Sequence, residues 1–441
     1  MDDSQQQKIK ETDPYGLETC SGLPFVVSPS IRRSAKADSS SCAGMANFTP
    51  SPASLINGSF AQSVSVCSHL EGKKRKRAPP RRKTKKPKKT DLNALSNSSQ
   101  SRIDYYKKLP YQRIDLPSYS LRDSPTAKHK RIMKMRCLKD GSRNEKRYEA
   151  IMDTCRYPPQ DTHKKVIMWF DCHGTKVLQR MPTRTIKPET LDGIVTRLEN
   201  LVEQTKMLKN IKTKSTETRH KSHKNWKARR NEYTDMHDKV CHTLRFTVHN
   251  QRGHPNDEPF PSSDMLGSGC KKSDDAMDFR SSPEIRELTE IISIMFASVD
   301  HEAWLKYREV YKVVHANYSS IRLTDGEDSG AFRCFSGMYI LFNMLTDVHR
   351  DLKDPKDGWV AMLVLGDHSG GGDLFLPDIG IRIKSQHGTV IFARSYKLHH
   401  FISEYEGRRY VFVFSTPAEL FVWAEKKLKE KEKEKKKEKE K

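Results

Sequence analysis

Five short apolar runs between residues 338 and 416 decide the fold class: MYILFNMLT (338–346), WVAMLVLG (359–366), GDLFLPDIGIRI (372–383), GTVIFARS (388–395) and YVFVFST (410–416). Each run has the length of one or two β-strands, and Gly, Pro and Asp residues separate them, as is typical of strands joined by turns. Five strand-like segments within about 80 residues indicate a small all-β barrel or jelly roll.

Helices are predicted directly upstream of these runs. Apolar residues recur there at helical spacing in two stretches, first at Ile285, Leu288, Ile291, Ile292, Met295 and Phe296, and then at Trp304, Tyr307, Val310 and Tyr311. Nearer the N-terminus, VIMWFDCHGTKVLQ (166–179) predicts two strands around a turn, and the stripe in 187–208 predicts a helix. Residues 254–282 have the composition of a boundary loop.

Composition divides the chain into four segments. Residues 1–100 are rich in Ser, Pro, Ala and Asn and poor in aromatic side chains, so we expect a disordered region. Residues 101–282 form a basic, mixed α/β region of uncertain fold, and residues 283–424 hold the helices and strands of the predicted domain. The Lys/Glu-rich tail, 425–441, is expected to be a solvated single helix or disordered.

Basic residues dominate the charge of the chain. There are 80 Lys and Arg residues against 56 Asp and Glu, and the net charge of +24 indicates a polyanionic partner, usually nucleic acid. The segment KKRKRAPPRRKTKKPKK (73–89) predicts a nuclear-localisation signal, with a basic linker as the alternative. We therefore expect a nuclear protein that binds an import receptor and DNA. No run of 18 apolar residues occurs, so no membrane span is expected.

A second basic stretch, KNIKTKSTETRHKSHKNWKARRNEY (209–233), carries interleaved aromatic residues. It either follows a phosphate backbone, with an aromatic ring available for stacking on a base, or is the solvated face of a helix.

The segment TDVHRDLKDPKDGW (346–359) places His349 two residues before Asp351. On a β-strand, residues i and i+2 point to the same face, so one imidazole and one carboxylate can reach the same ion.

About fifty residues later the chain offers two neighbouring histidines, His399 and His400, and then two neighbouring arginines, Arg408 and Arg409. Two histidines and one carboxylate on one face of an octahedral ion leave three positions open, which suits the oxygen chemistry of non-haem Fe(II). The sequence therefore predicts an iron site, with either histidine as the third ligand.

From about residue 336 to 415 the sequence resembles the TET/J-binding-protein branch of Fe(II)/2-oxoglutarate-dependent dioxygenases, in particular its compact fungal, transposon-associated type. The resemblance rests on the residues Asn343, Thr346, His349 and Asp351 and on the segments 357–383 and 388–414. It implies a double-stranded β-helix (jelly-roll) catalytic domain over 283–424 with flanking helices, α+β overall, in a protein that is expected to be monomeric.

The same resemblance assigns roles to residues of the motif. His349, Asp351 and His400 would hold the iron, because in these enzymes the third ligand precedes the 2-oxoglutarate arginine by about nine residues, and Arg409 would then bind the distal carboxylate. The pair His399 and Arg408 remains the alternative.

Two further residues receive roles from the resemblance. Asn343 would contact the cofactor near the metal. Asp354, three residues after Asp351, would contact the target base, since a carboxylate accepts a hydrogen bond from the N4 amine of cytosine, which thymine lacks. As the alternative, Asp354 is a turn residue before Pro355.

The implied activity is oxidation of 5-methylcytosine in DNA to 5-hydroxymethylcytosine, or further, with O2 as the co-substrate. The base would be flipped out of the duplex to reach the site. Two alternatives remain open. The same iron chemistry could act on N6-methyladenine, RNA or protein, or the chain could be a non-catalytic DNA-binding protein of a mobile element.

Overall fold

The computed structural model of the chain describes residues 97–123, 144–159, 164–204, 220–222, 240–250, 257–262, 264–265, 271–318 and 333–440. All of them belong to one compact unit, residues 90–441. The basic cluster 73–89 and nearly all of the predicted disordered region 1–100 lie outside the described residues, as does most of the basic stretch 209–233. Helix α1 (Asn97–Lys107) includes the last four residues of the stretch predicted as disordered.

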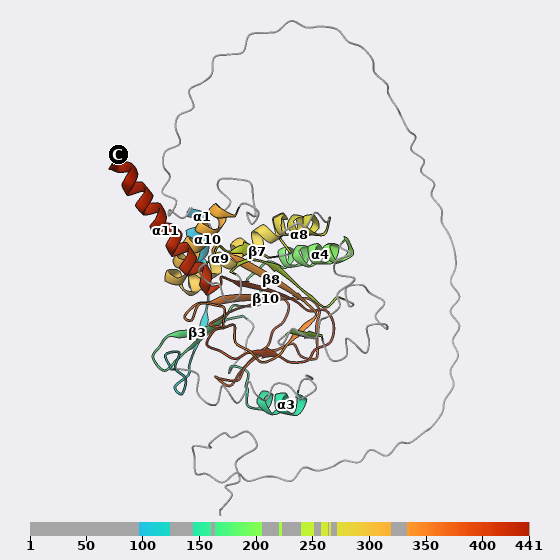
Figure 1. Cartoon of the computed structure of the whole chain (residues 1–441). Coiled ribbons are helices and arrows are strands. Elements are labelled where there is room, and N and C mark those ends of the chain that lie inside the picture. The colour runs from blue at the N-terminus through green and yellow to red at the C-terminus, as the bar shows by residue number, and fades with distance from the viewer. Residues whose placement is uncertain are drawn as a thin grey trace, which may run out of the picture. The chain divides into compact units, whose positions relative to one another are not determined.

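An eight-stranded sheet forms the centre of the described structure, with the strand order β1-β2-β3-β13-β10-β15-β8-β5 (Figure 1). Its strands are β1 (Tyr111–Asp115), β2 (Val166–Phe170), β3 (Lys176–Arg180), β5 (His242–Phe246), β8 (Gly337–Phe342), β10 (Val360–Leu365), β13 (Thr389–Ala393) and β15 (Tyr410–Ser415). Only β1 and β2 run parallel, and every other neighbouring pair is antiparallel. The chain therefore combines helices with one large, mainly antiparallel sheet, which confirms the α+β mixture expected from the sequence.

Three small sheets complete the β-structure. They are β12-β11-β14 (Ile381–Ile383, Leu374–Leu376, Phe401–Ile402), β4-β9 (His220–Ser222, Met344–Thr346) and β6-β7 (Val248–His249, Phe260–Pro261). The five apolar runs of the sequence correspond to strands β8 to β13 and β15. The turn between β2 and β3 also lies where the sequence predicts it, at the bulged end of an antiparallel pair.

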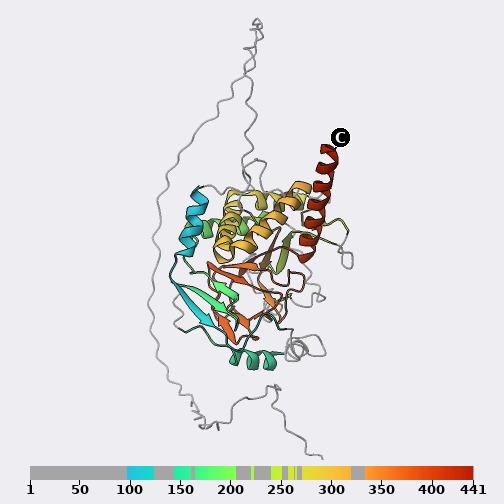
Figure 2. The same cartoon turned by 90° about the vertical axis from the view of Figure 1, so that its left-hand side faces the viewer.

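Alternation along the strands gives the large sheet two different faces. In β15, Tyr410, Phe412 and Phe414 belong to the main apolar core, whereas Val411 and Val413 point to the opposite face. The core is completed by α1, α4 (Pro188–Gln204), α8 (Lys271–Ser281), α9 (Pro283–Val299), α10 (His301–Asn317) and the start of α11 (Ala418–Lys439). Figures 1 and 2 show these helices on one side of the sheet, with α3 (Glu145–Asp153) on the other.

The small sheet β12-β11-β14 packs against the second face of the large sheet. A separate apolar cluster joins the two, and its members from both sheets include Trp169, Leu178, Leu374, Leu376, Ile391 and Ile402. Two sheets thus face each other across a side-chain layer, and the helices cover only the outer face of the larger sheet.

The sheet crosses the position at residue 282 where composition divides the chain. Strands β1, β2, β3 and β5 come from the region 101–282, yet they pair directly with one another or with β13 and β8 of the region 283–424. Part of the predicted boundary loop is helix α8, and residues 425–439 of the Lys/Glu-rich tail belong to helix α11. None of the described helices is long and apolar enough to cross a membrane.

Three consecutive glycines, Gly370 to Gly372, form the turn between β10 and β11, and all three have positive φ. Gly371 has a φ of +155°, and a Cβ atom there would overlap the carbonyl oxygen of Glu404. Only glycine fits, because any side chain would meet backbone that cannot rotate away.

We expect Gly371→Ala to lower the free energy of unfolding by at least about 2 kcal/mol, since the alanine must displace the Glu404 backbone. Gly174→Ala is the matched control: its φ is +74°, but nothing lies within 4 Å of the new Cβ. That change should cost only about 1 kcal/mol. Urea unfolding of both variants measures the difference, and equal losses would show that the turn has room for a side chain.

Candidate functional site

Three potential metal ligands meet where the two sheets face each other. The Nε2 atom of His349 lies 3.4 Å from Oδ1 of Asp351, and Nε2 of His400 lies 3.5 Å from Oδ2 of the same carboxylate. Their ligand atoms are all within 4.8 Å of one another, and no other group of three His, Cys, Asp or Glu residues in the described part of the chain does this. The described part of the chain thus contains one candidate metal centre.

Main-chain pairing holds the two imidazoles together. His349 and His400 form an antiparallel bridge in which each N–H donates to the carbonyl of the other, at 3.1 and 2.9 Å. Directly opposite residues project their side chains to the same face. As a result the ring centroids are 4.2 Å apart.

In each imidazole, Nδ1 lies within hydrogen-bond distance of a main-chain carbonyl oxygen. Nδ1 of His349 lies 2.7 Å from the carbonyl oxygen of Asp347, and Nδ1 of His400 lies 3.1 Å from that of Leu398. These contacts fit imidazoles that carry the proton on Nδ1, which leaves the lone pair of each Nε2 directed at Asp351. Two imidazoles and a carboxylate are a suitable donor set for a divalent transition metal.

A tight turn fixes Asp351 and Asp354 together. The N–H of Asp351 donates to the carbonyl of Ser395 over 3.2 Å, and the N–H of Asp354 donates back to the carbonyl of Asp351 over 3.0 Å. The hydroxyl of Ser395, just beyond β13, donates to Oδ2 of Asp354 over 2.6 Å. Asp354 is buried and contributes to the same cavity as Asp351, so the turn carries two carboxylates into one space.

The three potential ligands open into a cavity of about 570 Å³ on the inner face of the large sheet. Apolar side chains of three neighbouring strands form its floor, including Leu341, Met362, Val364, Val411 and Val413. Arg409 lies at one end of this floor, directly before β15. A cavity of this volume can hold a small-molecule ligand and still leave room for part of a second molecule.

Arg409 is a buried cation without an acidic partner. Its side chain is 3 % exposed, its Nε atom has no hydrogen-bond partner, and no carboxylate of the described residues pairs with its guanidinium. Burial lowers the pKa of this guanidinium, but arginine remains charged at neutral pH. A cation in this position favours a carboxylate ligand bound in the cavity.

His368 lies against Gly372 near this guanidinium, and its Nε2 bonds to the carbonyl of Ser385 over 2.7 Å. Burial, followed by the charge of Arg409, lowers the pKa of His368 to about 4. The imidazole is therefore neutral at pH 7 and does not add a second positive charge beside Arg409.

Sequence neighbours of these residues point elsewhere. Nδ1 of His399 contacts the carboxylate of Asp378 at 3.1 Å, and both side chains are almost fully buried away from the cavity. Arg408 forms a salt bridge of 3.1 Å with Glu199 of α4. The structure brings His400, not His399, next to Asp351, and it places Arg409, not Arg408, in the cavity.

Asn343 does not line the cavity, although the sequence analysis predicts that it contacts the cofactor. Its side chain is used by the main chain: Oδ1 accepts from the N–H of Arg409 and Nδ2 donates to the carbonyl of Val240, both at 2.9 Å. Its φ of +48° marks the break between β8 and β9. These contacts fix the main chain at Arg409, and a contact between Asn343 and the cofactor remains a prediction from the resemblance.

One wall of the cavity was not predicted from the sequence. It comes from β5, β6 and the residue between them and includes Thr243, Arg245, Thr247 and His249. The side-chain hydroxyl of Thr243 and Nδ1 of His249 are buried without a hydrogen-bond partner. The signal was available in HTLRFTVH (242–249), where polar and apolar residues alternate as in a strand with one polar face.

Comparisons with known proteins leave the family open. No family model and no curated protein matches the sequence. Among the solved structures that align with the chain are two with low sequence identity. NgTET1 in complex with 5mC DNA has 12 % identity and a TM-score of 0.37, over 62 % of this chain and 87 % of that one. The structure of OsALKBH1 has 10 % identity and a TM-score of 0.25, over 54 % of this chain and 96 % of that one.

We expect His400→Gln to weaken Mn(II) binding by at least about 100-fold, because it removes one of three donors. His399→Gln should change it less than threefold, since this side chain faces Asp378 and the glutamine amide can still donate there. Isothermal titration with Mn(II) alone measures both variants. Loss of binding in His399→Gln with retention in His400→Gln would reverse the assignment.

Proposed function

We propose that this protein is an Fe(II)- and 2-oxoglutarate-dependent dioxygenase that oxidises the methyl group of 5-methylcytosine in DNA. The observation that carries the proposal is a coincidence of two features in one cavity. One is the group of potential metal ligands His349, Asp351 and His400. The other is the buried guanidinium of Arg409, which pairs with no carboxylate of the described residues.

The three donors fit Fe(II). Two imidazole nitrogens and a carboxylate can occupy one face of an octahedral ion, which leaves the opposite face for other ligands. The main-chain bridge between His349 and His400 sets this geometry, and the Ser395 carbonyl holds the main chain at Asp351. When bound, the iron couples oxidation of a C–H bond by O2 to conversion of 2-oxoglutarate into succinate and CO2.

Arg409 fits the distal carboxylate of 2-oxoglutarate. A guanidinium binds a carboxylate through two parallel N–H···O bonds, and it does so most strongly where water is excluded. The hydrogen bond between the N–H of Arg409 and Oδ1 of Asn343 fixes the start of β15, so this end of the cavity is preorganised for the carboxylate. The apolar floor then suits the two methylene groups of the cofactor.

The arrangement of the sheets supports a double-stranded β-helix (jelly-roll) for this domain. Strands β8, β15, β10 and β13 form one antiparallel layer, and β12, β11 and β14 form a second layer that packs against it. The candidate ligands lie at the edge between the layers, where His349 and His400 pair. In this assignment the strands of 101–282 extend the larger layer on both sides.

The substrate assignment rests on charge and on Asp354. The net charge of +24 favours a polyanion, and Arg245, Arg350 and Lys353 contribute to the cavity that contains the metal ligands. Asp354 lines this cavity three residues after Asp351, where a carboxylate would accept a hydrogen bond from the N4 amine of a flipped cytosine. We propose that the segments 73–89 and 209–233 supply sequence-independent DNA affinity, that 73–89 also directs nuclear import through an import receptor, and that the protein acts as a monomer.

The full chain should convert 5-methylcytosine in duplex DNA to 5-hydroxymethylcytosine and release succinate when Fe(II), 2-oxoglutarate, O2 and ascorbate are present. Mass spectrometry of nucleosides measures the product, with duplexes that carry N6-methyladenine, methylated RNA and peptides as parallel substrates. Asp351→Ala should lower turnover by at least about 1000-fold, because it removes a donor from the metal. Its DNA affinity in gel-shift assays should remain within about twofold, because that affinity is assigned to the basic segments.

The variant Asp354→Ala distinguishes recognition of the target base from the oxidation chemistry. It should lower activity on 5-methylcytosine by about tenfold or more, the effect of one lost base-edge hydrogen bond, while the KM for 2-oxoglutarate changes less than threefold. Equal effects on both would remove the base-reading role. If another substrate is oxidised instead of 5-methylcytosine, the proposed iron chemistry stands and the proposed substrate is wrong. If no substrate yields succinate, the result favours a non-catalytic DNA-binding protein.

A further inference from the structure

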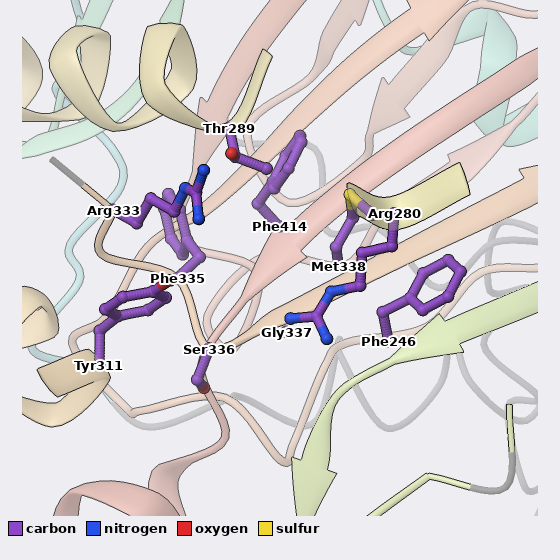
Figure 3. A pocket seen from close by; sticks show the side chains of 10 residues that line it. All are labelled: Phe246, Arg280, Thr289, Tyr311, Arg333, Phe335, Ser336, Gly337, Met338 and Phe414. Carbon is purple, nitrogen blue, oxygen red and sulfur yellow. The ribbon is translucent and has the colours of Figure 1, made fainter. Parts of the chain in front are cut away.

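A second, much smaller cavity lies on the opposite face of the large sheet, beneath the helices (Figure 3). Its volume is about 20 Å³. Phe246 of β5 and Phe414 of β15 are on the sheet side, Thr289 of α9 and Tyr311 of α10 on the helix side, and the segment Phe335–Met338 leads past it into β8. This cavity shares no lining residue with the one that contains His349, Asp351 and His400.

Two buried arginines point into this small cavity. Figure 3 shows Arg280 entering from helix α8 and Arg333 from the segment that precedes β8. The side chains are 3 % and 6 % exposed, and Nε and Nη1 of Arg280 and Nε of Arg333 have no hydrogen-bond partner. Neither guanidinium forms a salt bridge with a carboxylate of the described residues.

The remaining polar groups around the cavity are neutral. Tyr311 hydrogen-bonds with Arg333, and burial raises the pKa of the Tyr311 phenol, so it stays protonated. The hydroxyl of Ser336 is buried and has no hydrogen-bond partner. The rest of the lining is mainly aromatic or aliphatic, including Phe335 and Met338.

Two guanidinium groups in such surroundings require a counter-charge. Burial, with a smaller contribution in the same direction from the charge of Arg333, lowers the pKa of Arg280 only to about 10, so this side chain is cationic at pH 7. Arginine side chains in proteins carry a positive charge, so Arg333 is a second cation. Burying an ion without an opposite charge costs several kcal/mol, and the charge of Arg333 adds repulsion at Arg280. An anion placed between the two guanidiniums removes both penalties.

The size of the cavity limits that anion. A space of 20 Å³ admits about one water-sized atom, so an oxyanion with three or four oxygens does not fit without displacing the walls. We propose that this cavity binds a single halide ion, chloride in the cell, between Arg280 and Arg333, with the hydroxyl of Ser336 as a further donor.

The bound ion would fasten the helix layer to the sheet. Arg280 belongs to α8, Tyr311 to α10, and Arg333 and Ser336 to the segment that enters β8. Strand β8 carries Tyr339 and Leu341 on its other face, where they line the larger cavity. Chloride would therefore stabilise the scaffold of the proposed active site without being part of it, and the halide site does not depend on the proposed oxygenase function.

Thermal unfolding of the full chain in NaCl and in sodium gluconate of equal ionic strength tests the site. At chloride concentrations about tenfold above the dissociation constant, the Tm should be about 2 °C higher than in gluconate, because the ion binds only the folded state. In Arg280→Met the two salts should give the same Tm, since one guanidinium no longer holds the halide. In gluconate this variant should be at least as stable as the wild type, because an uncompensated charge is gone.

Lys306→Met is the matched control, because Lys306 is exposed on α10 and lies outside the cavity. It should keep the full difference between chloride and gluconate. A wild-type Tm that is the same in both salts would overturn the proposal.

Crystals of the wild-type protein grown in NaBr give an independent test that does not depend on a variant. An anomalous bromide peak between the guanidiniums of Arg280 and Arg333 is expected. The proposal is overturned if there is no peak there, or if a carboxylate of Asp325, Glu327 or Asp328, which lie outside the described residues, occupies the space instead.

Discussion

The paired hydrogen bonds between the main chains of His349 and His400 are the interaction on which the candidate site depends. They lock together two segments about fifty residues apart and set both imidazoles on one side of the pairing. Asp351, two residues after His349, points to the same face. The register of this one pairing therefore determines the positions of all three potential ligands. A slip of one residue would turn His399 toward Asp351 and His400 away from it.

Much of the fold could be predicted from the sequence because the strands β8 to β15 are short, apolar and separated by turn residues. The metal motif was also accessible, since His349 and Asp351 stand at the spacing of one strand face. Sequence could not decide between His399 and His400 by hydropathy, because β14 is covered on both sides: Ile402 packs in one apolar cluster and Phe401 in another. The spacing to Arg409 favoured His400 through the family resemblance, and the register of the bridge places His400 beside Asp351.

Two other features of the structure could not be predicted from the local sequence. The strands of 101–282 join the large sheet through partners remote in sequence, so composition alone suggested a boundary where none exists in the sheet. Asn343 looked like a cofactor ligand, but its positive φ and its bonds to the main chains of Arg409 and Val240 appear only in three dimensions. The segment HTLRFTVH (242–249), which contains β5 and β6, by contrast alternates polar and apolar residues from Thr243 onward, so strand structure could have been predicted there.

Buried guanidinium groups lie against both faces of the large sheet, and the space beside them differs between the two faces. On the inner face, Arg409 lies in a cavity of about 570 Å³, which leaves room for a carboxylate-bearing molecule. On the outer face, Arg280 and Arg333 lie around only about 20 Å³, which limits the counter-ion to one atom. In both places the same physical constraint applies, because a buried cation requires an anion, and the space beside it selects which one.

The central claim is that the metal ligands and Arg409 form a single binding site for one chelating cofactor. Calorimetric titration of 2-oxoglutarate into the full chain, with and without Mn(II), tests it most directly. The account predicts binding at least about tenfold tighter when the metal is present, and loss of this binding in Arg409→Met while Mn(II) still binds. Equal affinity with and without metal, or unchanged affinity in Arg409→Met, would contradict it.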